Sequence, residues 1–201
     1  MKIKLIIFTV IILFSISLQA QESNEHKRKG KIGITFSSFG ESDVFRIAGL
    51  DGEASYLGDN YYALGISYVR SISHWLELET GLEYSRHTII ITPAFNPNID
   101  ISSRETKLSI ISTPLMLRAN FLKFFFINGG LFLDIDTSIS SSVDSQTGIG
   151  TMFGIATKYD FNFGASIFLN PYVKFHSLGS FSMGGNQQKL LESGVRIGFA
   201  F

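Results

Sequence analysis

The stretch "LELETGLEY" (residues 76–84) decides the fold, because it separates apolar and charged side chains by a period of two. Successive side chains of a β-strand point to opposite faces of its sheet. The stretch is therefore predicted to be a strand with one apolar face and one face that holds three carboxylates. The even positions hold Leu76, Leu78, Leu82 and Tyr84, and the odd positions hold Glu77, Glu79, Gly81 and Glu83.

The same alternation recurs along the chain and predicts eight strands with connectors of alternating length. Short turns on one side and long loops on the other are typical of an outer-membrane β-barrel. We therefore predict an all-β fold, a closed eight-stranded antiparallel transmembrane β-barrel with up-and-down connections. The expected strands are 30–37, 61–70, 75–86, 107–119, 122–135, 156–169, 171–178 and 189–201. Short turns are expected at "SISH" (71–74), "NFLK" (120–123) and "LNP" (169–171), and long connectors at about 38–60, 87–106, 136–155 and 179–188.

One segment departs from the alternation. Within residues 107–120 the apolar positions are even at Leu108 and Ile110 but odd at Leu115 and Leu117. One extra residue would absorb this change, and proline inside a sheet is tolerated chiefly at edges and bulges. We therefore predict a β-bulge at 112–114, which contains Pro114.

The barrel is expected to close, and its apolar face is expected to point outward. A sheet in hydrocarbon cannot leave an edge unpaired, so the strand that ends at Phe201 should pair with the strand near Ile32. A soluble barrel of lipocalin type, with the apolar face inward around a ligand, is the alternative. Aromatic residues near strand ends, frequent glycine on the charged face and the terminal phenylalanine favour the membrane barrel. The expected girdles are Tyr68, Trp75, Phe121, Tyr172 and Phe201 on the short-turn side, and Tyr61, Tyr62 and Tyr84 on the long-loop side. Of these, Trp75, Tyr172 and Phe201 are our membrane-interface residues.

Residues 1–20 have the layout of a secretory signal peptide. Lys2 and Lys4 precede an apolar core at 5–18, and Ala20 supplies a small residue at the expected cleavage point. An uncleaved anchor is the alternative, although the core is shorter than the roughly 20 residues that a spanning helix needs. We expect export through the Sec pathway, a short polar periplasmic leader at 21–29, and a barrel at 30–201 with both termini periplasmic.

Composition excludes several classes of function. The 201 residues include no cysteine, and 17 Lys+Arg balance 17 Asp+Glu. This excludes disulfide scaffolds and cysteine-ligated metals and disfavours nucleic-acid binding. The four histidines are scattered, and "GIGTMFG" (148–154) lacks phosphate-loop spacing. We therefore predict no enzyme and no cofactor, and we assign no catalytic, cofactor-binding or metal-ligating residue.

The charged face is expected to fill the barrel. Eight strands enclose a space that side chains just fill, and unpaired charge there is costly, so ion pairs should plug and rigidify the lumen. A small ion-conducting pore is one alternative. A lipid-modifying or proteolytic enzyme at the barrel rim, using His87 with a nearby Ser and Asp, is another. The predicted lumen cluster is Glu77, Glu79, Glu83, Asp134, Asp160, Lys174, Glu192 and Arg196, with Arg118 added if the bulge turns it inward.

Four stretches resemble the PorT-like outer-membrane β-barrel domain family of Bacteroidota. They are "STPLMLRANF" (112–121), "FFFINGGLFLD" (124–134), "YDFNFGASIFLNPYVKFHSLGSF" (159–181) and "VRIGFAF" (195–201). The proline followed by apolar and basic residues resembles that family's proline strand, and "DFNFGAS" resembles its Asp-Phe-x-x-Gly strand. The resemblance spans about 30–201 and implies an outer-membrane location in a diderm bacterium, with links to secretion and gliding systems for some members. It supplies no catalytic residue.

Function is expected to lie in the long connectors, because they are polar and stand on a rigid scaffold. The apolar stretch "TIIITPAFNPNIDI" (88–101) either extends strands beyond the membrane or contacts a partner. We expect a structural or partner-binding protein. Its partners would be outer-membrane lipid and other envelope or secretion-system proteins, and not nucleic acid.

Overall fold

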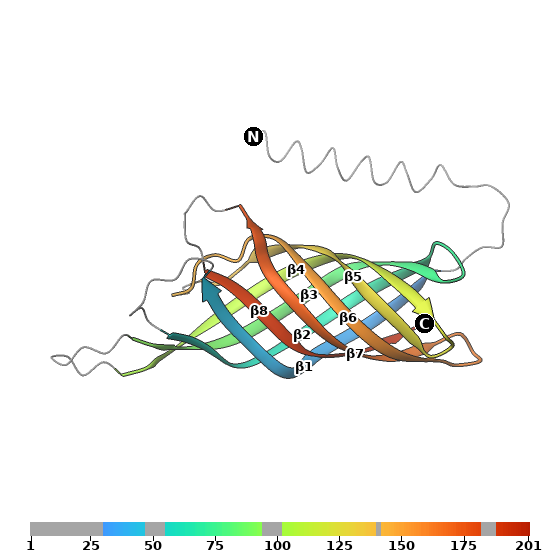
Figure 1. The fold of residues 1–201 in the computed structure, drawn as a ribbon, viewed down its shortest axis with the longest axis horizontal. Helices are drawn as coiled ribbons and strands as arrows, with labels where there is room; N and C mark the ends of the chain where they lie inside the picture. The colour runs from blue at the N-terminus through green and yellow to red at the C-terminus, as the bar shows by residue number, and fades with distance from the viewer. Residues whose placement is uncertain (1–29, 47–54, 94–101, 140–141, 182–187) are drawn as a thin grey trace.

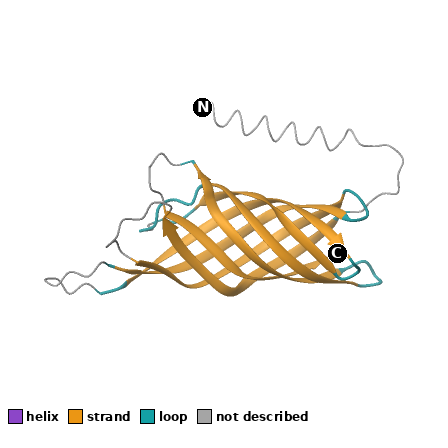
Figure 2. Ribbon diagram, in the orientation of Figure 1, coloured by secondary structure: helices purple, strands orange, loops and turns teal. Residues whose placement is uncertain are grey.

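The computed structural model describes residues 30–46, 55–93, 102–139, 142–181 and 188–201. Within these ranges the chain is a closed barrel of eight antiparallel strands, as predicted, and each strand pairs with its neighbours in sequence (Figures 1 and 2). None of these residues forms a helix long and apolar enough to cross a membrane. The predicted signal peptide and leader lie outside the described residues. The strands are β1 (Lys31–Arg46), β2 (Ser55–Ser71), β3 (Leu76–Thr92), β4 (Arg104–Phe121), β5 (Phe125–Asp136), β6 (Gly148–Asp160), β7 (Ser166–Ser180) and β8 (Gln188–Ala200).

The first and last strands close the barrel, which confirms the predicted pairing. The amide of Ile32 donates to the carbonyl of Phe201 at 3.0 Å, and the amide of Phe201 donates to the carbonyl of Ile32 at 2.9 Å. The register between β1 and β8 then continues from Gly33, which is paired with Ala200. Both open edges of the sheet are thereby removed.

The two ends of the barrel differ in their connections. The connections 72–75, 122–124 and 161–165 share one end with Phe201, which we call the turn end (Figure 1). The strand ends that flank the connections 47–54, 93–103, 137–147 and 181–187 lie at the other end, which we call the loop end. The alternation of short and long connectors is as predicted, but the strands reach further toward the loop end than the sequence indicated.

The predicted strands 156–169 and 171–178 are wrong, because the hairpin turns earlier. Its turn is 161–165, where the amide of Phe161 donates to the carbonyl of Ala165 at 2.8 Å. Gly164 has φ +99°, a conformation that glycine adopts without strain. "DFNFGAS" therefore forms mainly a turn, "GIGTMFG" lies in β6, and Pro171 lies inside β7.

The predicted β-bulge at 112–114 is also wrong. Thr80 pairs with Leu115 and Glu83 pairs with Ser112, so the register between β3 and β4 does not shift across Pro114. The pairing of β4 with β5 runs unbroken through the same residues. A strand proline removes one donor, which affects only one of its two ladders. Side chains alternate regularly between the two faces of β4 here. The apolar positions therefore move from even to odd because the apolar face itself changes, and not because a residue is inserted.

The barrel in fact exchanges its apolar face along its length. Near the turn end, outward residues such as Ile32 and Leu117 are apolar, and the inward residues include the charged side chains Glu79, Arg118 and Arg196. Near the loop end, Arg86 is exposed outside while Ile89 and Ile110 are fully buried inside. The shift of the apolar positions from even to odd within 107–120 therefore marks the height at which the apolar face changes from inside to outside. It does not mark a β-bulge.

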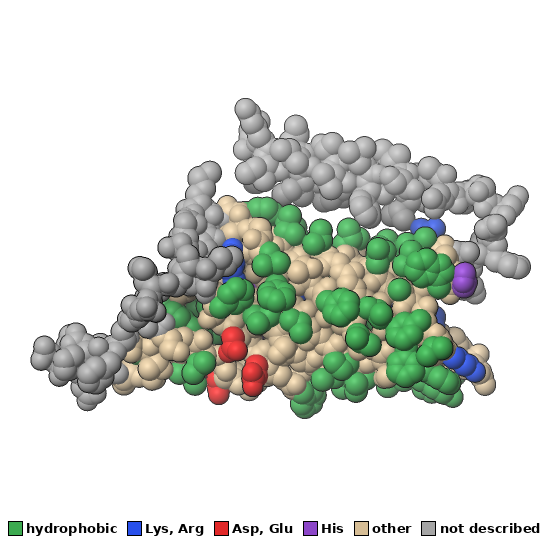
Figure 3. Space-filling view, viewed as in Figure 1, with side chains coloured by type: hydrophobic (Ala, Val, Ile, Leu, Met, Phe, Trp, Pro, Cys, Tyr) green, Lys and Arg blue, Asp and Glu red, His purple; other side chains and the backbone are tan. Residues whose placement is uncertain are grey.

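Outward apolar residues lie on all eight strands and form a belt around the barrel, and Figure 3 shows part of it on one face. On β4 the belt runs from Ile111 to Phe121, ten residue steps. At about 3.3 Å per residue and a strand tilt of about 40°, it is about 25 Å tall, the height expected of a membrane-spanning apolar band. Exposed members of the belt include Ile32, Ile34, Leu64, Ile66, Leu82, Leu115, Leu131, Phe153, Ile155, Ile167, Ile197 and Phe199.

Two predicted girdle residues point inward instead. Tyr172 is only 5% exposed and Tyr61 is only 2% exposed, so neither reaches a membrane interface. Tyr172 was expected next to a turn at "LNP", but the true turn places it in the middle of β7 on the inner face. Trp75 and Phe201 are exposed at the turn end.

Candidate functional site

The barrel interior is the candidate site, because charged side chains of five strands meet there. We describe it as three layers from the turn end to the loop end. The arginine layer comprises Glu79, Arg118 and Arg196; the histidine layer comprises His87, Asp134, His176 and Glu192; and the apolar cap comprises Val44, Ile89, Ile91, Leu108, Ile110, Val143 and Leu190. Lys174 and Glu83 form a pair between the first two layers.

The arginine layer joins three strands through one buried carboxylate. Arg118 Nε donates to Glu79 Oε2 at 2.5 Å, and Arg196 Nη2 donates to Glu79 Oε1. The rings of Phe126 and Phe168 lie 4.9 and 4.7 Å from the Arg118 guanidinium carbon. A carboxylate that accepts from two guanidinium groups is well satisfied, and the aromatic faces stabilise the cation. This layer ties β3 to β4 and β8 inside the barrel.

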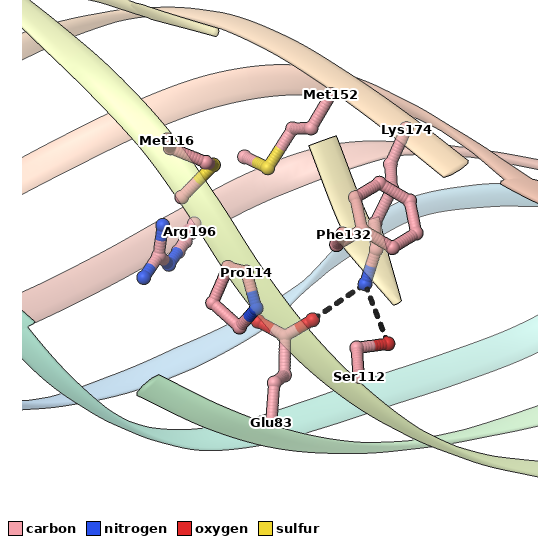
Figure 4. A pocket seen from close by; sticks show the side chains of 8 residues that line it. All are labelled: Glu83, Ser112, Pro114, Met116, Phe132, Met152, Lys174 and Arg196. Carbon is pink, nitrogen blue, oxygen red and sulfur yellow. Dashed lines mark hydrogen bonds and ion pairs between the residues drawn. The ribbon is translucent and has the colours of Figure 1, made fainter. Parts of the chain in front are cut away.

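Lys174 lies next to the arginine layer on the side of the loop end. Its Nζ donates to Glu83 Oε1 at 2.6 Å and to Ser112 Oγ at 3.4 Å, and it lies 4.6 Å from the centre of the Phe132 ring. Figure 4 shows the side chain pointing at both oxygens. The cavity beside it has a volume of about 10 Å³. That is room for about one water molecule and not for a passing solute.

The histidine layer is a continuous chain of buried polar groups. His176 Nδ1 lies 2.8 Å from Asp134 Oδ2, and His176 Nε2 lies 3.4 Å from Glu192 Oε2. On the far side of the same carboxylate oxygen, His87 Nε2 lies at 3.3 Å. The four side chains come from β3, β5, β7 and β8 and are all 0% exposed.

Hydroxyl groups hold both carboxylates of this layer from outside it. Ser112 Oγ donates to Asp134 Oδ1 at 2.6 Å, and the Tyr172 hydroxyl donates to Glu192 Oε1. The Tyr61 hydroxyl lies 3.3 Å from that of Tyr172. Each carboxylate therefore has one oxygen occupied by a hydroxyl and the other directed at a histidine, which fixes its orientation.

The apolar cap closes the interior toward the loop end. Part of the connection between β5 and β6 contributes to it, because Val143 packs in the cluster and Gln146 is fully buried. Gln146 Nε2 donates to the carbonyl of Gln188 at 2.9 Å, and the amide of Leu190 donates to Gln146 Oε1 at 3.1 Å. The polar layers are thereby separated from the water beyond the loop end.

The turn end is more open. Asp160 is half exposed there and contacts Lys31 at 3.6 Å and Lys158 at 3.4 Å. Glu77 lines a cavity of about 20 Å³ at the same mouth, together with Arg118. Glu77 and Asp160 were predicted in the lumen cluster, but they stand at its mouth because β3 and β6 reach the turn end at these residues.

The structure places the other six predicted lumen residues inside: Glu79, Glu83, Asp134, Lys174, Glu192 and Arg196. Arg118 joins them without a bulge, since the regular parity of β4 already turns it inward. His87 was expected in a rim loop, and that placement is wrong because it lies in β3. His87 has the same odd parity as Glu79 and Glu83, so extending the predicted strand by one residue would have placed it on the charged face.

Together, the closed sheet, the apolar belt and the charged interior define the class of protein, a transmembrane β-barrel. No protein-family model matches the chain, and no curated protein matches it either. Solved structures similar to it include the outer membrane protein OprG from Pseudomonas aeruginosa (15% identity, 88% of this chain and 97% of that chain, TM-score 0.47). Others are the outer membrane protein AlkL in DMPC lipid bilayers (10% identity, 89% and 90%, TM-score 0.43) and the translocator domain of the autotransporter NalP from Neisseria meningitidis (11% identity, 96% and 95%, TM-score 0.37). At these TM-scores the similarities do not assign a family.

Proposed function

We propose that this chain is an integral outer-membrane protein with a structural or partner-binding role, and that it is not a channel. One observation supports the proposal above all: the wall is apolar outside, while the interior is packed with paired charges and closed by the apolar cap. A lipid-facing belt about 25 Å tall gives the barrel a place in a bilayer. A filled interior leaves the two ends as the surfaces that can act.

The outer membrane is the proposed location because closed barrels with short turns at one end are built there. The signal-peptide pattern at 1–20 supports export, and the first strand would then begin and the last strand end on the periplasmic side. Membrane fractionation and detergent-gel electrophoresis test this. The protein should be found in the outer-membrane fraction, and the unheated sample should migrate differently from the boiled one. Recovery in the aqueous extract would contradict the proposal.

The PorT-like resemblance belongs to the same proposal. The motif at Pro114 keeps its strand context in β4, whereas "DFNFGAS" forms a turn. Membership of that family would predict that the gene lies near other envelope genes of a diderm bacterium. Deletion of the gene followed by assays of secretion and gliding would test the functional link.

A closed lumen predicts no steady conductance. The cavities beside Lys174 and at the turn-end mouth, of about 10 and 20 Å³, together hold only a few water molecules. Barrels reconstituted in planar bilayers should therefore show no discrete current steps above the lipid background. Reproducible unitary steps from the wild-type protein would support the rival small pore instead.

The loop end is the proposed docking surface. From Ile111 to Arg104, seven residue steps raise β4 about 18 Å beyond the belt, and Glu105 and Lys107 are exposed there. The described part of the 88–101 stretch extends β3 as far as Thr92, and the remainder lies outside the described residues. The loop-end tips of the extended strands therefore lie away from the lipid.

Affinity purification after mild solubilisation tests the docking role. Replacing residues 94–101 by a Gly/Ser segment of equal length should remove a co-purifying envelope protein. Replacing the turn 72–75 in the same way is the matched control and should retain it. A barrel that purifies alone under every mild condition would count against a docking role.

The rim-enzyme alternative is not part of the proposal. It needs His87 at an accessible rim, whereas the side chain is sealed below the apolar cap. Substitution of His87 should therefore leave any lipid-modifying or proteolytic activity of the cells unchanged.

A further inference from the structure

The histidine layer brings three metal-ligating side chains to one point. His87, His176 and Glu192 each offer one ligand atom, and these atoms all lie within 4.8 Å of one another. The three residues are far apart in the sequence and come from β3, β7 and β8. Two histidines and one carboxylate are a recurrent ligand set for zinc and other divalent transition metals.

The distances from Glu192 to the two histidines are long for hydrogen bonds and fit those between the ligands of one metal ion. Glu192 Oε2 lies 3.3 Å from His87 Nε2 and 3.4 Å from His176 Nε2. Both separations exceed the usual N–H···O range of 2.7–3.2 Å. Ligand bonds of about 2.0–2.1 Å at tetrahedral angles place neighbouring ligand atoms about 3.3–3.4 Å apart. The carboxylate oxygen therefore lies at the right distance from both ring nitrogens for a shared ion.

The surroundings orient these ligands as they do in known metal sites. Metal-binding histidines commonly direct the second ring nitrogen at a carboxylate. His176 does so, since its Nδ1 lies 2.8 Å from Asp134. The Tyr172 hydroxyl occupies the other oxygen of Glu192, so that Oε2 is the oxygen directed at the two histidines.

The ring of His87 is oriented by its packing and, within the described ranges, lacks the second-nitrogen partner that His176 has. Its Nδ1 is buried and has no hydrogen-bond partner among the described residues. Buried polar atoms are normally paired, and an exception calls for a reason. The ring is stacked on Tyr61 at 5.5 Å between centroids, in an orientation that directs Nε2 toward Glu192. Nε2 also lies 3.1 Å from Ser85 Oγ, so an ion bound there would replace that hydrogen bond, while Nδ1–H would stay unpaired.

The charge of the layers also favours a cation. The arginine layer has one carboxylate for two guanidinium groups, and Lys174 balances Glu83. The histidine layer has two carboxylates, Asp134 and Glu192, and its imidazoles are uncharged when they ligate a metal. The surplus positive charge of the arginine layer offsets one of these two negative charges, so the interior keeps a net negative charge that a bound cation would offset.

We propose that His87, His176 and Glu192 bind one divalent transition-metal ion of the zinc class inside the barrel. The strand order places β3 four strands away from β7, so the ion links opposite walls of the barrel. The apolar cap covers the site, so the metal is acquired as the barrel assembles and is exchanged slowly afterwards. Its role is to cross-link the barrel below the loop end.

The first test uses the full mature chain, purified through a tag without histidine and refolded into lipid vesicles. After refolding with and without Zn²⁺ or Co²⁺, excess metal is removed and the bound metal is measured. We expect one ion per folded chain, and the visible absorption of the Co²⁺ form should be that of a tetrahedral site. Zn²⁺ at 100 times its dissociation constant should raise the ratio of folded to unfolded protein about 100-fold.

Matched variants identify the ligands. His87→Gln, His176→Gln and Glu192→Gln should each lose the bound ion and the metal-dependent gain in stability. His74→Gln is the control, because His74 is exposed in the turn 72–75 and should leave both unchanged. The readout is the difference in stability between the refolded protein with metal and without it. A variant that is less stable under both conditions does not change this difference.

If a variant fails to fold, the metal content of the wild-type protein still tests the proposal. Folded wild-type barrels that bind no Zn²⁺, Co²⁺ or Ni²⁺ when refolded in their presence would overturn the proposal. An octahedral Co²⁺ spectrum typical of weak surface binding would overturn it as well. So would full retention of the ion by a folded His87→Gln and Glu192→Gln pair of variants.

Discussion

The most direct test of the orientation of the wall is an arginine placed on it at mid-depth. Ile197 in β8 points outward, is 38% exposed and lies between Phe36 of β1 and Leu169 of β7. It is four residue steps from Phe201, and at about 3.3 Å per residue and a tilt of about 40° this is about 10 Å from the turn-end edge. The belt is about 25 Å tall, so Ile197 lies close to its middle. Ile197→Arg should therefore cost about 2–4 kcal/mol of folding free energy in a bilayer.

Leu57→Arg is the matched control, since it makes the same chemical change at a different depth. Leu57 in β2 is 57% exposed, and it lies seven residues beyond Leu64, the partner of Tyr84 at the loop-end edge of the belt. Its side chain therefore meets water. Arginine there should cost about 0–1 kcal/mol, as lipid-facing charges do outside the bilayer core.

Both variants are measured by reversible unfolding in denaturant from lipid vesicles, with the emission of the single tryptophan, Trp75, as the signal. The expected result is a difference of about 2 kcal/mol or more between the two substitutions. Equal costs for Ile197→Arg and Leu57→Arg would refute the belt. So would a cost at Ile197 that stays the same when the vesicle is replaced by a lipid-free aqueous buffer in which the protein remains folded.

Two further predictions concern the interior. Glu79→Ala leaves two buried guanidinium groups without their carboxylate and should cost about 3–5 kcal/mol of folding free energy in the same unfolding assay. Glu77→Ala at the mouth should cost less than about 1 kcal/mol. Similar values for the two would show that the arginine layer does not stabilise the barrel. Leu108→Ala should cost about 2–5 kcal/mol of folding free energy because it opens a cavity in the apolar cap. Leu115→Ala should cost less, because acyl chains fill the space that it leaves. A larger cost for Leu115→Ala than for Leu108→Ala would contradict the exchange of apolar faces.

The period of two was enough to predict the barrel and most of its inner face. In β3 the parity that begins with Leu76 and Glu77 holds through all 17 residues, and it placed Glu79 and Glu83 inside. The closure at Phe201 followed from a general requirement, since hydrocarbon offers no partner for an open edge. These predictions succeeded because the alternation of side chains is a local property of an extended chain.

The prediction failed where two physical causes produce the same sequence signal. "NP" at 170–171 looks like a turn, yet Pro171 fits into β7 by omitting one hydrogen bond, and the turn uses Gly164 instead. "GIGTMFG" looks like a loop because glycine is frequent in loops. In β6, however, an inward glycine makes room, and a Cβ at Gly150 would overlap the Phe132 ring.

The histidine layer could be predicted only in part. Parity could have shown that His87 and His176 point inward, since each continues a strand whose charged face was already recognised. Parity does not show that β3 and β8 bring His87 and Glu192 to the same depth. That depends on the shear of the barrel and on three register shifts, near Ser38, Asp59 and Gly150, none of which leaves a clear mark in the sequence.

The exchange of apolar faces explains why a barrel of this size can project so far from a membrane. Where lipid surrounds the wall, the outside supplies the apolar contacts and the interior can be charged. Beyond Tyr84 the wall meets water, so a charged interior would leave the extended strands with no apolar core. Ile89, Leu108 and Leu190 supply that core from inside, as in a soluble barrel. The loop end therefore has its own source of stability, and the extended strands keep their pairing there without support from the bilayer.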